Sequence, residues 1–254
     1  MSVCVISGSA SGIGAATRRR CETAGDRVVG IDLRGAEVEA DLSHPEGREK
    51  AIGGALEQCQ GQIDRLVLCA GVGQTAPLEM LPSINYFGAV ELLDGLLSSM
   101  SGRRDAAAVV LSSNSVRMVR FDDHPFVAAL LEGDEAGARK LIEAEQNGFL
   151  AYAGGKLALA KAIRRRTMDW GRAGVRLNAI APGPTETPLL EQARAVPALA
   201  AGLEGLPNPL GRHAAPEEIA EVIHFLLSPE AAYVHGAVLF ADAGIDAAMN
   251  PDEL

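Results

Sequence analysis

A tyrosine and a lysine four residues apart, Tyr152 and Lys156, could carry out proton transfer. Side chains at this spacing lie one above the other on the same face of a helix. A phenol has a pKa of about 10, and a neighbouring ammonium group favours the phenolate by Coulomb attraction. Moving the phenol pKa toward ~7 needs about 4 kcal/mol, which a partly dry cleft can supply and a wet surface cannot. The pair therefore predicts general acid–base chemistry if the fold places it in a pocket.

Two glycines, Gly154 and Gly155, separate the members of this pair. Each of them costs roughly 1 kcal/mol in the interior of a helix. Because the predicted helix continues to about Trp170, the glycines indicate that another group must approach this backbone closely.

A glycine-rich turn near the start of the chain could hold phosphate groups. The segment Ser7–Gly14 follows an apolar strand, Val3–Ile6, and precedes a helical run. In that context Gly8 permits a tight turn, Gly12 lets the backbone approach a pyrophosphate, and Gly14 lets the helix pack near the sheet. The free N–H groups of the helix then face the phosphates, and a plain glycine-rich turn is the alternative. The other predicted cofactor-binding residues of this turn are Ser11 and Ile13.

Acidic residues follow the next two strands at positions that suit a nucleotide. The strand Arg27–Asp32 ends in an acid about 20 residues beyond the glycine turn, where a carboxylate accepts hydrogen bonds from ribose hydroxyls and repels a 2′-phosphate. Asp32 therefore favours NAD over NADP, although the neighbouring Arg34 could soften that choice. Asp41 and Leu42 close the following short strand, and Leu42 could pack against an adenine. Alternatively, Asp41 caps the helix that comes next.

Three further positions combine strand ends with polar or small side chains. Ala70 and Gly71 follow an apolar strand and would let the chain pass closely beneath a ribose. Asn85 stands among apolar residues of a predicted helix, where an asparagine ordinarily lies at the surface or bends the helix. A fifth apolar strand, residues 106–111, ends at Ser112 and Ser113.

Apolar strands alternate with helical segments over residues 1–254, without a linker or an internal repeat. This order is typical of an α/β protein with a Rossmann-type, doubly wound parallel sheet in a single domain, whose site lies at the carboxyl ends of the strands. Residues 116–148 form a polar helical insertion between Ser113 and Tyr152, and residues 185–213 are interpreted as a mobile substrate flap. The predicted strands are 3–6, 27–32, one ending at 42, 64–71, 106–111, 175–181 and 238–241, and the predicted helices are 15–24, 45–60, 83–93, 152–170 and 216–227.

Composition and charge exclude several classes of function. The 254 residues are 48% hydrophobic and 22% charged, which allows a packed core, and the formal net charge is −10. An acidic chain without a basic stripe argues against nucleic-acid binding, and the arginine runs at 18–20 and 164–166 are interpreted as solvated helix faces. Without a run of 18 apolar residues or a leader sequence, we expect no membrane span.

The cysteines and histidines indicate neither disulfides nor a metal centre. Cys4, Cys21, Cys59 and Cys69 include no C-x-x-C pair, so we expect reduced thiols in a cytoplasmic protein. The five histidines are scattered without an H-E-x-x-H or H-x-x-x-H pair, so no metal is expected.

The motifs occur in a fixed order along the chain: Ser7-Gly8-x-x-x-Gly12-Ile13-Gly14, Asp32, Asp41-Leu42, Ala70-Gly71, Asn85, Ser113, Tyr152-x-x-x-Lys156 and Pro182-Gly183. This ordered set resembles the short-chain dehydrogenase/reductase family over essentially the whole chain. Within that family the chain looks most like the bacterial 3α-hydroxysteroid dehydrogenase/carbonyl reductases, through stretches such as 85–89, 179–190 and 233–237.

The resemblance implies an oxidoreductase that interconverts a secondary alcohol and a ketone with NAD. Tyr152 would be the general acid and base, Lys156 would bind the nicotinamide ribose and lower the tyrosine pKa, and Ser113 would orient the carbonyl. Asn85 would hold a water that links Lys156 to solvent, and the hydride transfer itself belongs to the cofactor. The residues implied to lie near the nicotinamide carboxamide are Thr185 or Thr187.

The chain departs from the family pattern in three places. Ser7 replaces the usual threonine and keeps its hydroxyl, whereas Cys69 replaces an asparagine whose side chain helps to pin the next turn. The catalytic serine and tyrosine are also separated by roughly 26 more residues than is usual. Because such an insertion should obstruct the family's main dimer contact, we expect a homodimer formed through the helix 216–227 and the strand 238–241.

Three functional interpretations remain open on the sequence alone. The leading one is an NAD-linked 3α-hydroxysteroid dehydrogenase/carbonyl reductase acting on a small hydrophobic alcohol or ketone. The second keeps this chemistry for a xenobiotic, terpenoid or aromatic-degradation substrate, since the apolar flap suits a hydrophobic ring system but core packing has the same composition. The third is an inactive dinucleotide sensor, which the presence of Tyr152, Lys156, Ser113 and Asn85 disfavours.

Overall fold

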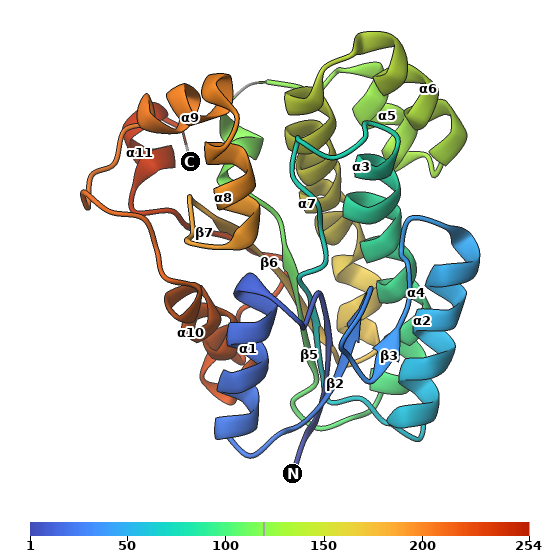
Figure 1. The fold of residues 1–254 in the computed structure, drawn as a ribbon. Helices are drawn as coiled ribbons and strands as arrows, with labels where there is room; N and C mark the ends of the chain where they lie inside the picture. Colours follow the sequence, from blue (N-terminus) through green and yellow to red (C-terminus); the bar gives the residue numbers. More distant parts are fainter. Residues whose placement is uncertain (119, 254) are drawn as a thin grey trace.

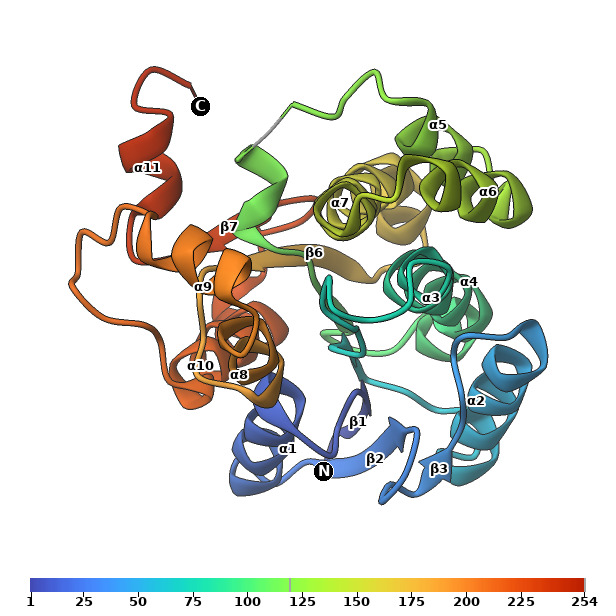
Figure 2. The ribbon, with the colours of Figure 1, turned by 45° about the horizontal axis from the view of Figure 1, so that its top comes forward.

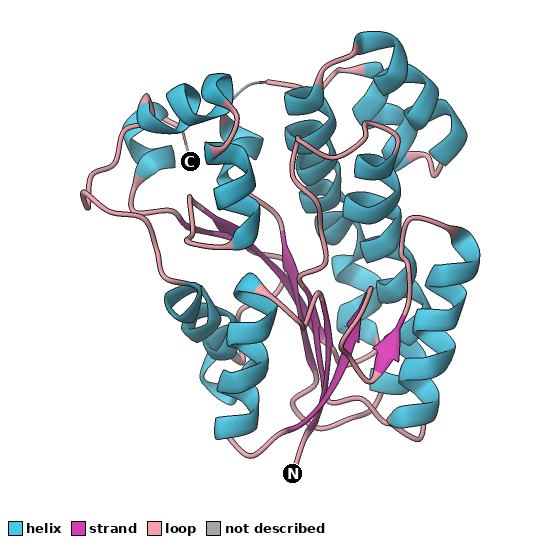
Figure 3. Ribbon diagram, in the orientation of Figure 1, coloured by secondary structure: helices cyan, strands magenta, loops and turns pink. Residues whose placement is uncertain are grey.

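The computed structural model describes residues 1–118 and 120–253, arranged as a parallel sheet with helices on both faces (Figures 1 and 3). The strands are β1 (Val3–Ser7), β2 (Arg27–Asp32), β3 (Val38–Glu39), β4 (Arg65–Leu68), β5 (Ala107–Leu111), β6 (Arg176–Pro182) and β7 (Val238–Ala241). Within the described residues these seven strands pair in the order β3-β2-β1-β4-β5-β6-β7, all parallel. The order reverses between β1 and β4, where doubly wound sheets bind their ligands. The predicted Rossmann-type α/β fold is confirmed.

Helices cover both faces of this sheet (Figure 1). They are α1 (Gly12–Thr23), α2 (Pro45–Gln58), α3 (Met80–Pro82), α4 (Gly88–Met100), α5 (Pro125–Leu131), α6 (Glu135–Glu145), α7 (Gly148–Arg172), α8 (Pro188–Arg194), α9 (Pro197–Glu204), α10 (Pro216–Leu227) and α11 (Ile245–Met249). Helix α1 packs against α10 on one face, and α2, α4 and α7 cover the other. The sequence patterns do not predict α11. In the part of the chain described here, no helix is both long and apolar enough to cross a bilayer.

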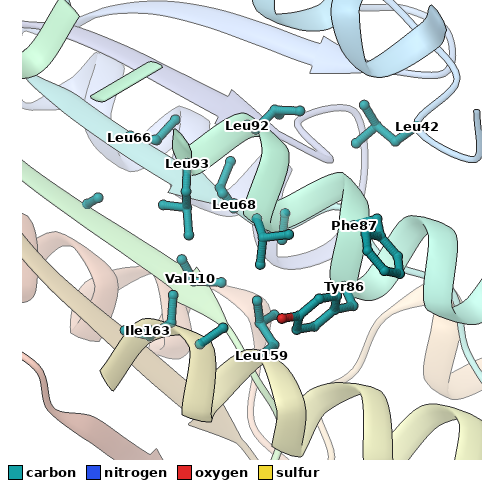
Figure 4. Close-up of a cluster of buried hydrophobic side chains, with 14 of the residues drawn as sticks. Leu42, Leu66, Leu68, Tyr86, Phe87, Leu92, Leu93, Val110, Leu159 and Ile163 are labelled. Atoms are coloured by element: carbon teal, nitrogen blue, oxygen red, sulfur yellow. The ribbon is translucent and has the colours of Figure 1, made fainter. Parts of the chain in front are cut away.

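The strands are apolar throughout because both of their faces are buried. In β1, Val5 joins the core beneath α2, α4 and α7, whereas Cys4 and Ile6 point into the core beneath α1 and α10. This alternation follows from the two-residue period of a strand. Figure 4 shows the larger core between the sheet and helices α4 and α7, with Leu93 and Val110 among the side chains that fill it.

The helix predicted around Asn85 is interrupted by a π-helical turn. Helix α3 leads directly into this turn, Ser83–Phe87, which continues as α4. Single π-turns within α-helices are rare and frequently occur at functional sites. The side chain of Asn85 is completely buried. Of the two ordinary roles for an asparagine in a helix, the surface position is therefore wrong, since the side chain is buried within the π-turn.

The segment between β5 and α7 forms the predicted helical insertion, apart from Val119, which lies outside the described residues. Its helices α5 and α6 pack against each other on the outer side of α7 (Figure 2). Phe126 of α5 is fully buried, and a Cβ placed on Gly154 would lie 3.2 Å from its ring. The predicted close approach is thus confirmed at Gly154. At Gly155 a Cβ would meet no described protein atom within 4 Å, so no packing contact there calls for glycine.

The predicted flap (residues 185–213) contains the two short helices α8 and α9. Its ends are held together because Thr185 and Ala214 form a β-bridge and the Ala214 N–H donates to the carbonyl of Pro184 at 3.1 Å. Pro188 and Pro197 occupy the first helical positions, where a missing N–H carries no cost. Helix α9 is rich in apolar residues, yet none of them is buried. Its leucines are therefore available to line a cavity.

The arginine runs were interpreted as solvated helix faces, and they do lie at the surface, where several of the arginines form ion pairs. Arg20 of α1 pairs with Glu221 of α10 at 2.8 Å, and Arg166 of α7 pairs with Asp94 of α4 at 2.6 Å. These pairs connect neighbouring helices at the surface, where each contributes ~0–1 kcal/mol. Their acidic partners come from distant segments, which charge patterning within one helix cannot reveal.

Candidate active site

A cavity of about 960 Å³ opens at the carboxyl ends of the central strands, beneath the flap. A cavity of this size is typical of sites for small molecules and cofactors. All of the predicted site residues line it except Asn85, which lies behind its wall. The predicted residues that line it are Gly8, Ser11, Gly12, Ile13, Gly14, Asp32, Asp41, Leu42, Ala70, Gly71, Ser113, Tyr152, Lys156, Thr185 and Thr187.

The glycine turn depends on two close approaches between backbone segments. Gly8 has a φ of +70°, and a Cβ there would lie 2.7 Å from the backbone nitrogen of Ala70. A Cβ on Gly14 would lie 2.0 Å from the carbonyl oxygen of Gly8, so only glycine lets α1 begin this close to β1. Gly12 has a φ of +52°, and a Cβ there would lie 3.2 Å from the Cγ2 of Thr187. The first N–H groups of α1 are thus open to the cavity and can bind an anion.

Asp32 ends β2 beside this turn and is held in place by backbone donors. Its Oδ2 accepts the N–H of Ala10 at 2.9 Å, and its Oδ1 accepts the N–H of Leu33 at 2.7 Å. Because carboxylate oxygens accept more than one hydrogen bond each, the group retains acceptor capacity for ribose hydroxyls.

Asp41 and Leu42 lie beyond β3 rather than closing it, because the strand already ends at Glu39. Asp41 Oδ1 accepts the N–H of Ser43 at 2.9 Å, and hydrogen bonds from the Ser43 side chain and backbone hold the pKa of Asp41 below its usual range. The carboxylate therefore shapes the turn that leads into α2, whose N-cap is His44. Leu42 is buried and forms part of the cavity wall.

The turn after β4 is held from two sides. The Ser7 Oγ accepts the N–H of Ala70 at 3.3 Å, which gives this turn a side-chain hydrogen bond despite the cysteine at position 69. The amide of Asn85 pairs with the backbone of Val72, since Nδ2 donates to its carbonyl at 2.9 Å and Oδ1 accepts from its N–H at 2.8 Å. Asn85 thus positions the cavity wall from behind.

Ser113 and Tyr152 bring a hydroxyl and a phenol together in the cavity. Burial raises the pKa of Tyr152 above its ordinary value, and a hydrogen bond with the Ser113 hydroxyl lowers it in part. The Ser113 Oγ also accepts the N–H of Ser115 at 3.2 Å, which orients it. In the chain by itself the net shift of the phenol pKa is therefore upward, and its lowering by Lys156 stays a prediction. The phenol is protonated at neutral pH and can donate to a carbonyl oxygen.

Lys156 lies buried one helical turn after Tyr152. Its Nζ donates to the carbonyl oxygen of Leu111, at the end of β5, at 2.8 Å. Burial lowers the pKa of this ammonium to about 8. A Cβ on Gly71 would lie 3.6 Å from Nζ, so the small-residue turn leaves room around the charge. Two of the three ammonium donors remain for ligand hydroxyls.

Thr185 and Thr187 form the polar end of the flap. The Thr185 hydroxyl donates to the carbonyl of Gly183 at 3.0 Å. The Thr187 hydroxyl donates to the carbonyl of Thr185 at 3.1 Å and accepts the N–H of Leu190 at 3.3 Å, which caps α8. Apart from Gln192, the rest of the flap wall is apolar and comprises Pro188, Leu189, Leu190, Ala193, Ala198, Leu199, Gly202, Leu203 and Leu206.

The sequence patterns miss several other wall residues. Asn114 and Ser115 are buried and line the cavity, and among the described residues the Asn114 Nδ2 and the Ser115 Oγ have no hydrogen-bond partner. Their position directly after Ser113 was the available signal. Met118 and Phe149, near the two ends of the insertion, also line the cavity. The insertion therefore borders the ligand-binding space.

The donors and acceptors of this cavity fit a dinucleotide. The open end of α1 suits a pyrophosphate, and the carboxylate of Asp32 suits a ribose with a free 2′-hydroxyl. At the far strand ends, the phenol of Tyr152 and the ammonium of Lys156 stand where a proton can be exchanged with a ligand oxygen. The structure thus defines a dinucleotide-dependent oxidoreductase.

Family models place the chain more narrowly. The model for short chain dehydrogenases matches residues 2–129, and a related model described as enoyl-(acyl carrier protein) reductase matches residues 135–246. The chain belongs to the short-chain dehydrogenase/reductase family, and it is an oxidoreductase of that family.

Individual relatives match over the full length. A 3-alpha-hydroxysteroid dehydrogenase/carbonyl reductase from Comamonas testosteroni is 52% identical to this chain, and the alignment covers 100% of both sequences. A coniferyl-alcohol dehydrogenase from a Pseudomonas species is 31% identical over 95% of each chain. The crystal structure of the 3-alpha-hydroxysteroid dehydrogenase from Pseudomonas sp. B-0831, complexed with NADH, matches with a TM-score of 0.98, 46% identity and complete coverage of both chains.

Proposed function

We propose that this protein is an NAD-dependent enzyme that interconverts a secondary alcohol and a ketone, with 3α-hydroxysteroids as its substrate class. One observation carries the reaction: Tyr152, Ser113 and Lys156 line the same cavity as the glycine turn and Asp32. The substrate class is supported by the 52% identity to the Comamonas 3-alpha-hydroxysteroid dehydrogenase/carbonyl reductase.

Tyr152 is the proposed general acid and base. In the reductive direction its protonated phenol donates to the carbonyl oxygen, and in the oxidative direction its phenolate accepts the proton of the alcohol. Ser113 holds the same oxygen by a hydrogen bond, and the cofactor would accept the hydride as NAD in oxidation and donate it as NADH in reduction. Because burial raises the tyrosine pKa, the acid form dominates at neutral pH, and alcohol oxidation should accelerate as the pH rises.

Lys156 and Asn85 are proposed to support the proton transfer by Tyr152 without contacting the reacting oxygen themselves. We propose that the free donors of Lys156 bind the nicotinamide ribose and that its charge stabilises the phenolate as it forms. The side-chain amide of Asn85 is already paired with Val72. A water that relays protons from Lys156 would therefore be held by the backbone of the π-turn rather than by this amide.

The rest of the cofactor site is assigned from the positions of its polar groups. Asp32 binds the adenosine ribose and repels a 2′-phosphate, which favours NAD over NADP. Asp41 and Leu42 border the adenine, and Thr185 and Thr187 lie near the nicotinamide carboxamide.

An apolar ring system is the substrate that the flap wall favours. Leu199, Leu203 and Leu206 are partly exposed around the cavity, and Phe149, at the start of α7, adds an aromatic surface. Covering such side chains gains about 25 cal/mol per Å² of apolar surface. A fused hydrophobic ligand with one reacting oxygen would cover this wall and reach Tyr152.

Formation of NADH from NAD and androsterone, compared between the wild-type protein and Tyr152→Phe, tests the proposal. We expect turnover by the wild type and a loss of at least 10³-fold in kcat for the variant, because the phenol exchanges the reacting proton. NADH binding should be equal in both proteins, which separates the chemical role of the phenol from folding.

Two other outcomes are informative. Wild-type protein that binds NADH but does not oxidise androsterone would exclude the steroid assignment, and aromatic and terpenoid secondary alcohols would be screened against the same variant. A Tyr152→Phe variant with wild-type turnover would exclude the proposed acid–base role.

We also propose a homodimer formed through α10 and β7. Strand β7 is the last in the sheet order, and such an edge strand exposes unpaired backbone groups. Large apolar side chains lie exposed nearby: Phe225 at 46%, Leu239 at 38% and Tyr233 completely. Analytical ultracentrifugation should give a dimer that Phe225→Arg converts to a monomer. A monomeric wild type, or a dimer built on α4 and α7, would contradict this arrangement.

A cytoplasmic location is proposed from the thiols. Cys4, Cys21, Cys59 and Cys69 are all free. Burial raises the pKa of Cys59 to about 11 and that of Cys69 to about 12, so both thiols stay protonated and unreactive. Unpaired thiols of this kind are typical of reducing compartments.

A further inference from the structure

A charged side chain without a part in the proposed chemistry lies buried next to the cofactor site. Arg48, in the first half of α2, is only 1% exposed. A guanidinium group removed from water this completely costs several kcal/mol unless its donors are paired. The groups that pair with it therefore show which parts of the chain depend on it.

Two carboxylates from different segments neutralise Arg48. Glu135, the first residue of α6 in the insertion, accepts from both terminal nitrogens, at 2.6 and 3.2 Å. Glu91 of α4 accepts from Nε at 2.8 Å. Burial opposes ionisation of Glu135, but the hydrogen bonds with Arg48 and Ser83 and the attraction of nearby positive charges, Arg48 first among them, together keep the pKa of Glu135 below the usual range. The insertion is thus fastened to α2 by a charged, two-pronged contact.

The same guanidinium reaches the backbone of the cavity wall. The Nη1 of Arg48 donates to the carbonyl oxygens of Leu42 and Ser83, each at 3.4 Å. Leu42 lines the cavity, and a Cβ on Gly88 would lie 3.2 Å from its side chain. Figure 4 shows Leu42 and Phe87 at the same end of α4, and the Phe87 ring lies 5.9 Å from the guanidinium. Arg48 therefore connects three parts of the chain by hydrogen bonds: Leu42 in the cavity wall, Ser83 in the π-turn and Glu91 in α4.

We propose that Arg48 is a positioning residue for the adenosine end of the cofactor. Glu135 holds the guanidinium of Arg48 in place, and through this ion pair the helical insertion supports nucleotide binding. This inference rests on the proposed use of NAD. With Glu135 present, the guanidinium is held where Nη1 meets the Leu42 carbonyl. Without the Glu135 carboxylate, the guanidinium is paired only with Glu91, whose side chain is 38% exposed and draws the guanidinium toward solvent. The Leu42 carbonyl then loses its hydrogen bond from Arg48.

Glu135→Gln tests this role because it removes the charge and keeps the size of the side chain. The full-length protein is titrated with NADH and with 5′-AMP, and kcat is measured at saturating NAD. We expect about tenfold weaker binding of both nucleotides, a KM for NAD raised by the same factor, and an unchanged kcat. Glu143→Gln, at an exposed position of the same helix, is the matched control and should change none of these values.

A second variant keeps the result interpretable if charge loss perturbs the insertion. Arg48→Lys retains the positive charge but loses the planar guanidinium that donates two hydrogen bonds to Glu135, so it should weaken 5′-AMP binding. In the Arg48→Lys background, Glu135→Gln should then weaken 5′-AMP binding less than it does in the wild type. Wild-type affinity for 5′-AMP in Glu135→Gln would overturn the inference while leaving the proposed function intact. A wild-type protein that binds no NADH would overturn the proposed function and the positioning role with it.

Discussion

The glycine turn and the flap build two walls of one cavity by different means. At the glycine turn the fit is between backbone atoms, since a Cβ on Gly14 would lie 2.0 Å from the Gly8 carbonyl oxygen and one on Gly8 would lie 2.7 Å from the Ala70 nitrogen. In the flap, α9 buries no residue, and partly exposed side chains such as Leu203 form the wall.

This difference makes the glycine turn intolerant of substitution and leaves the flap side chains free to vary. Backbone contacts are set by the sheet and cannot adapt to a larger side chain without moving a strand or a helix. Apolar side chains on a short, thinly packed helix can be exchanged at little cost to folding. The cofactor end is therefore rigid, whereas the flap can be adjusted to the shape of a substrate.

The largest effect is expected from Gly14→Ala, which inserts one methyl group into the rigid end. The new Cβ would overlap the Gly8 carbonyl, so α1 must move away from β1. Overpacking of this kind costs typically about 1–3 kcal/mol, and this contact should lie at the upper limit. We expect urea unfolding to show that loss, and NADH titration to show loss of binding.

Gly53→Ala is the matched control for this variant. Gly53 is an exposed residue of α2, and a Cβ there would meet nothing within 4 Å. Alanine is better than glycine in a helix interior by about 1 kcal/mol, so this variant should be slightly more stable. Equal behaviour of the two variants would mean that the close approach at Gly14 does not limit the fold.

An intermediate effect is expected from Lys156→Met, where the two ends of the cavity meet. Burial lowers the pKa of Lys156 from 10.5 to about 8, so protonating it in the folded state costs about 3 kcal/mol. This cost lowers the free energy of unfolding in full below pH 8, where the lysine is protonated in both states. Between pH 8 and 10.5 the unfolded chain binds more protons than the folded one, so the free energy of unfolding rises with pH and the cost disappears. Methionine removes it but leaves the Leu111 carbonyl without its donor, for a net gain of about 1–2 kcal/mol at pH 7.

Urea unfolding of this variant at pH 7 and pH 10 measures the gain, which should shrink at the higher pH, while turnover is lost. Lys161→Met is the control on the same helix, because Lys161 is 31% exposed and pairs with Asp122 at 2.7 Å. Its effect should stay within about 0.5 kcal/mol at both pH values. A Lys156→Met variant less stable than the wild type at pH 7 would show that the buried charge is better compensated than its surroundings indicate.

The same contrast explains how much could be predicted from the sequence. Gly8, Gly12, Gly14 and Asp32 were identified because a strand followed by a glycine-rich turn, a helix and a second strand ending in an acid has a local sequence signature. The order of strands and helices, and hence the sheet, followed from short-range periodicity. The insertion was recognised by its polar helical pattern.

What the sequence could not supply depends on contacts between distant segments. The pairing of Arg48 with Glu135, separated by 87 positions, follows from the packing of the insertion. Burial of Tyr152 and Lys156 sets the direction of their pKa shifts, and the sequence shows the neighbouring charge but not the desolvation. Asn114 and Ser115 have no periodic pattern, and their position after Ser113 alone did not reveal that they line the cavity.

The smallest effect is expected from Leu203→Ala, which tests the adaptable end. Leu203 lines the cavity from α9 and is only partly buried, so truncation should leave the unfolding free energy and the affinity for NADH unchanged. Losing its apolar contact with a ring system should cost about 1.5 kcal/mol, or roughly tenfold in kcat/KM for androsterone. Leu210→Ala is the control, because Leu210 belongs to the flap but is 68% exposed and does not line the cavity. A stability loss in Leu203→Ala as large as that of Gly14→Ala would remove the distinction between a rigid and an adaptable wall, since α9 would then be part of the folded core.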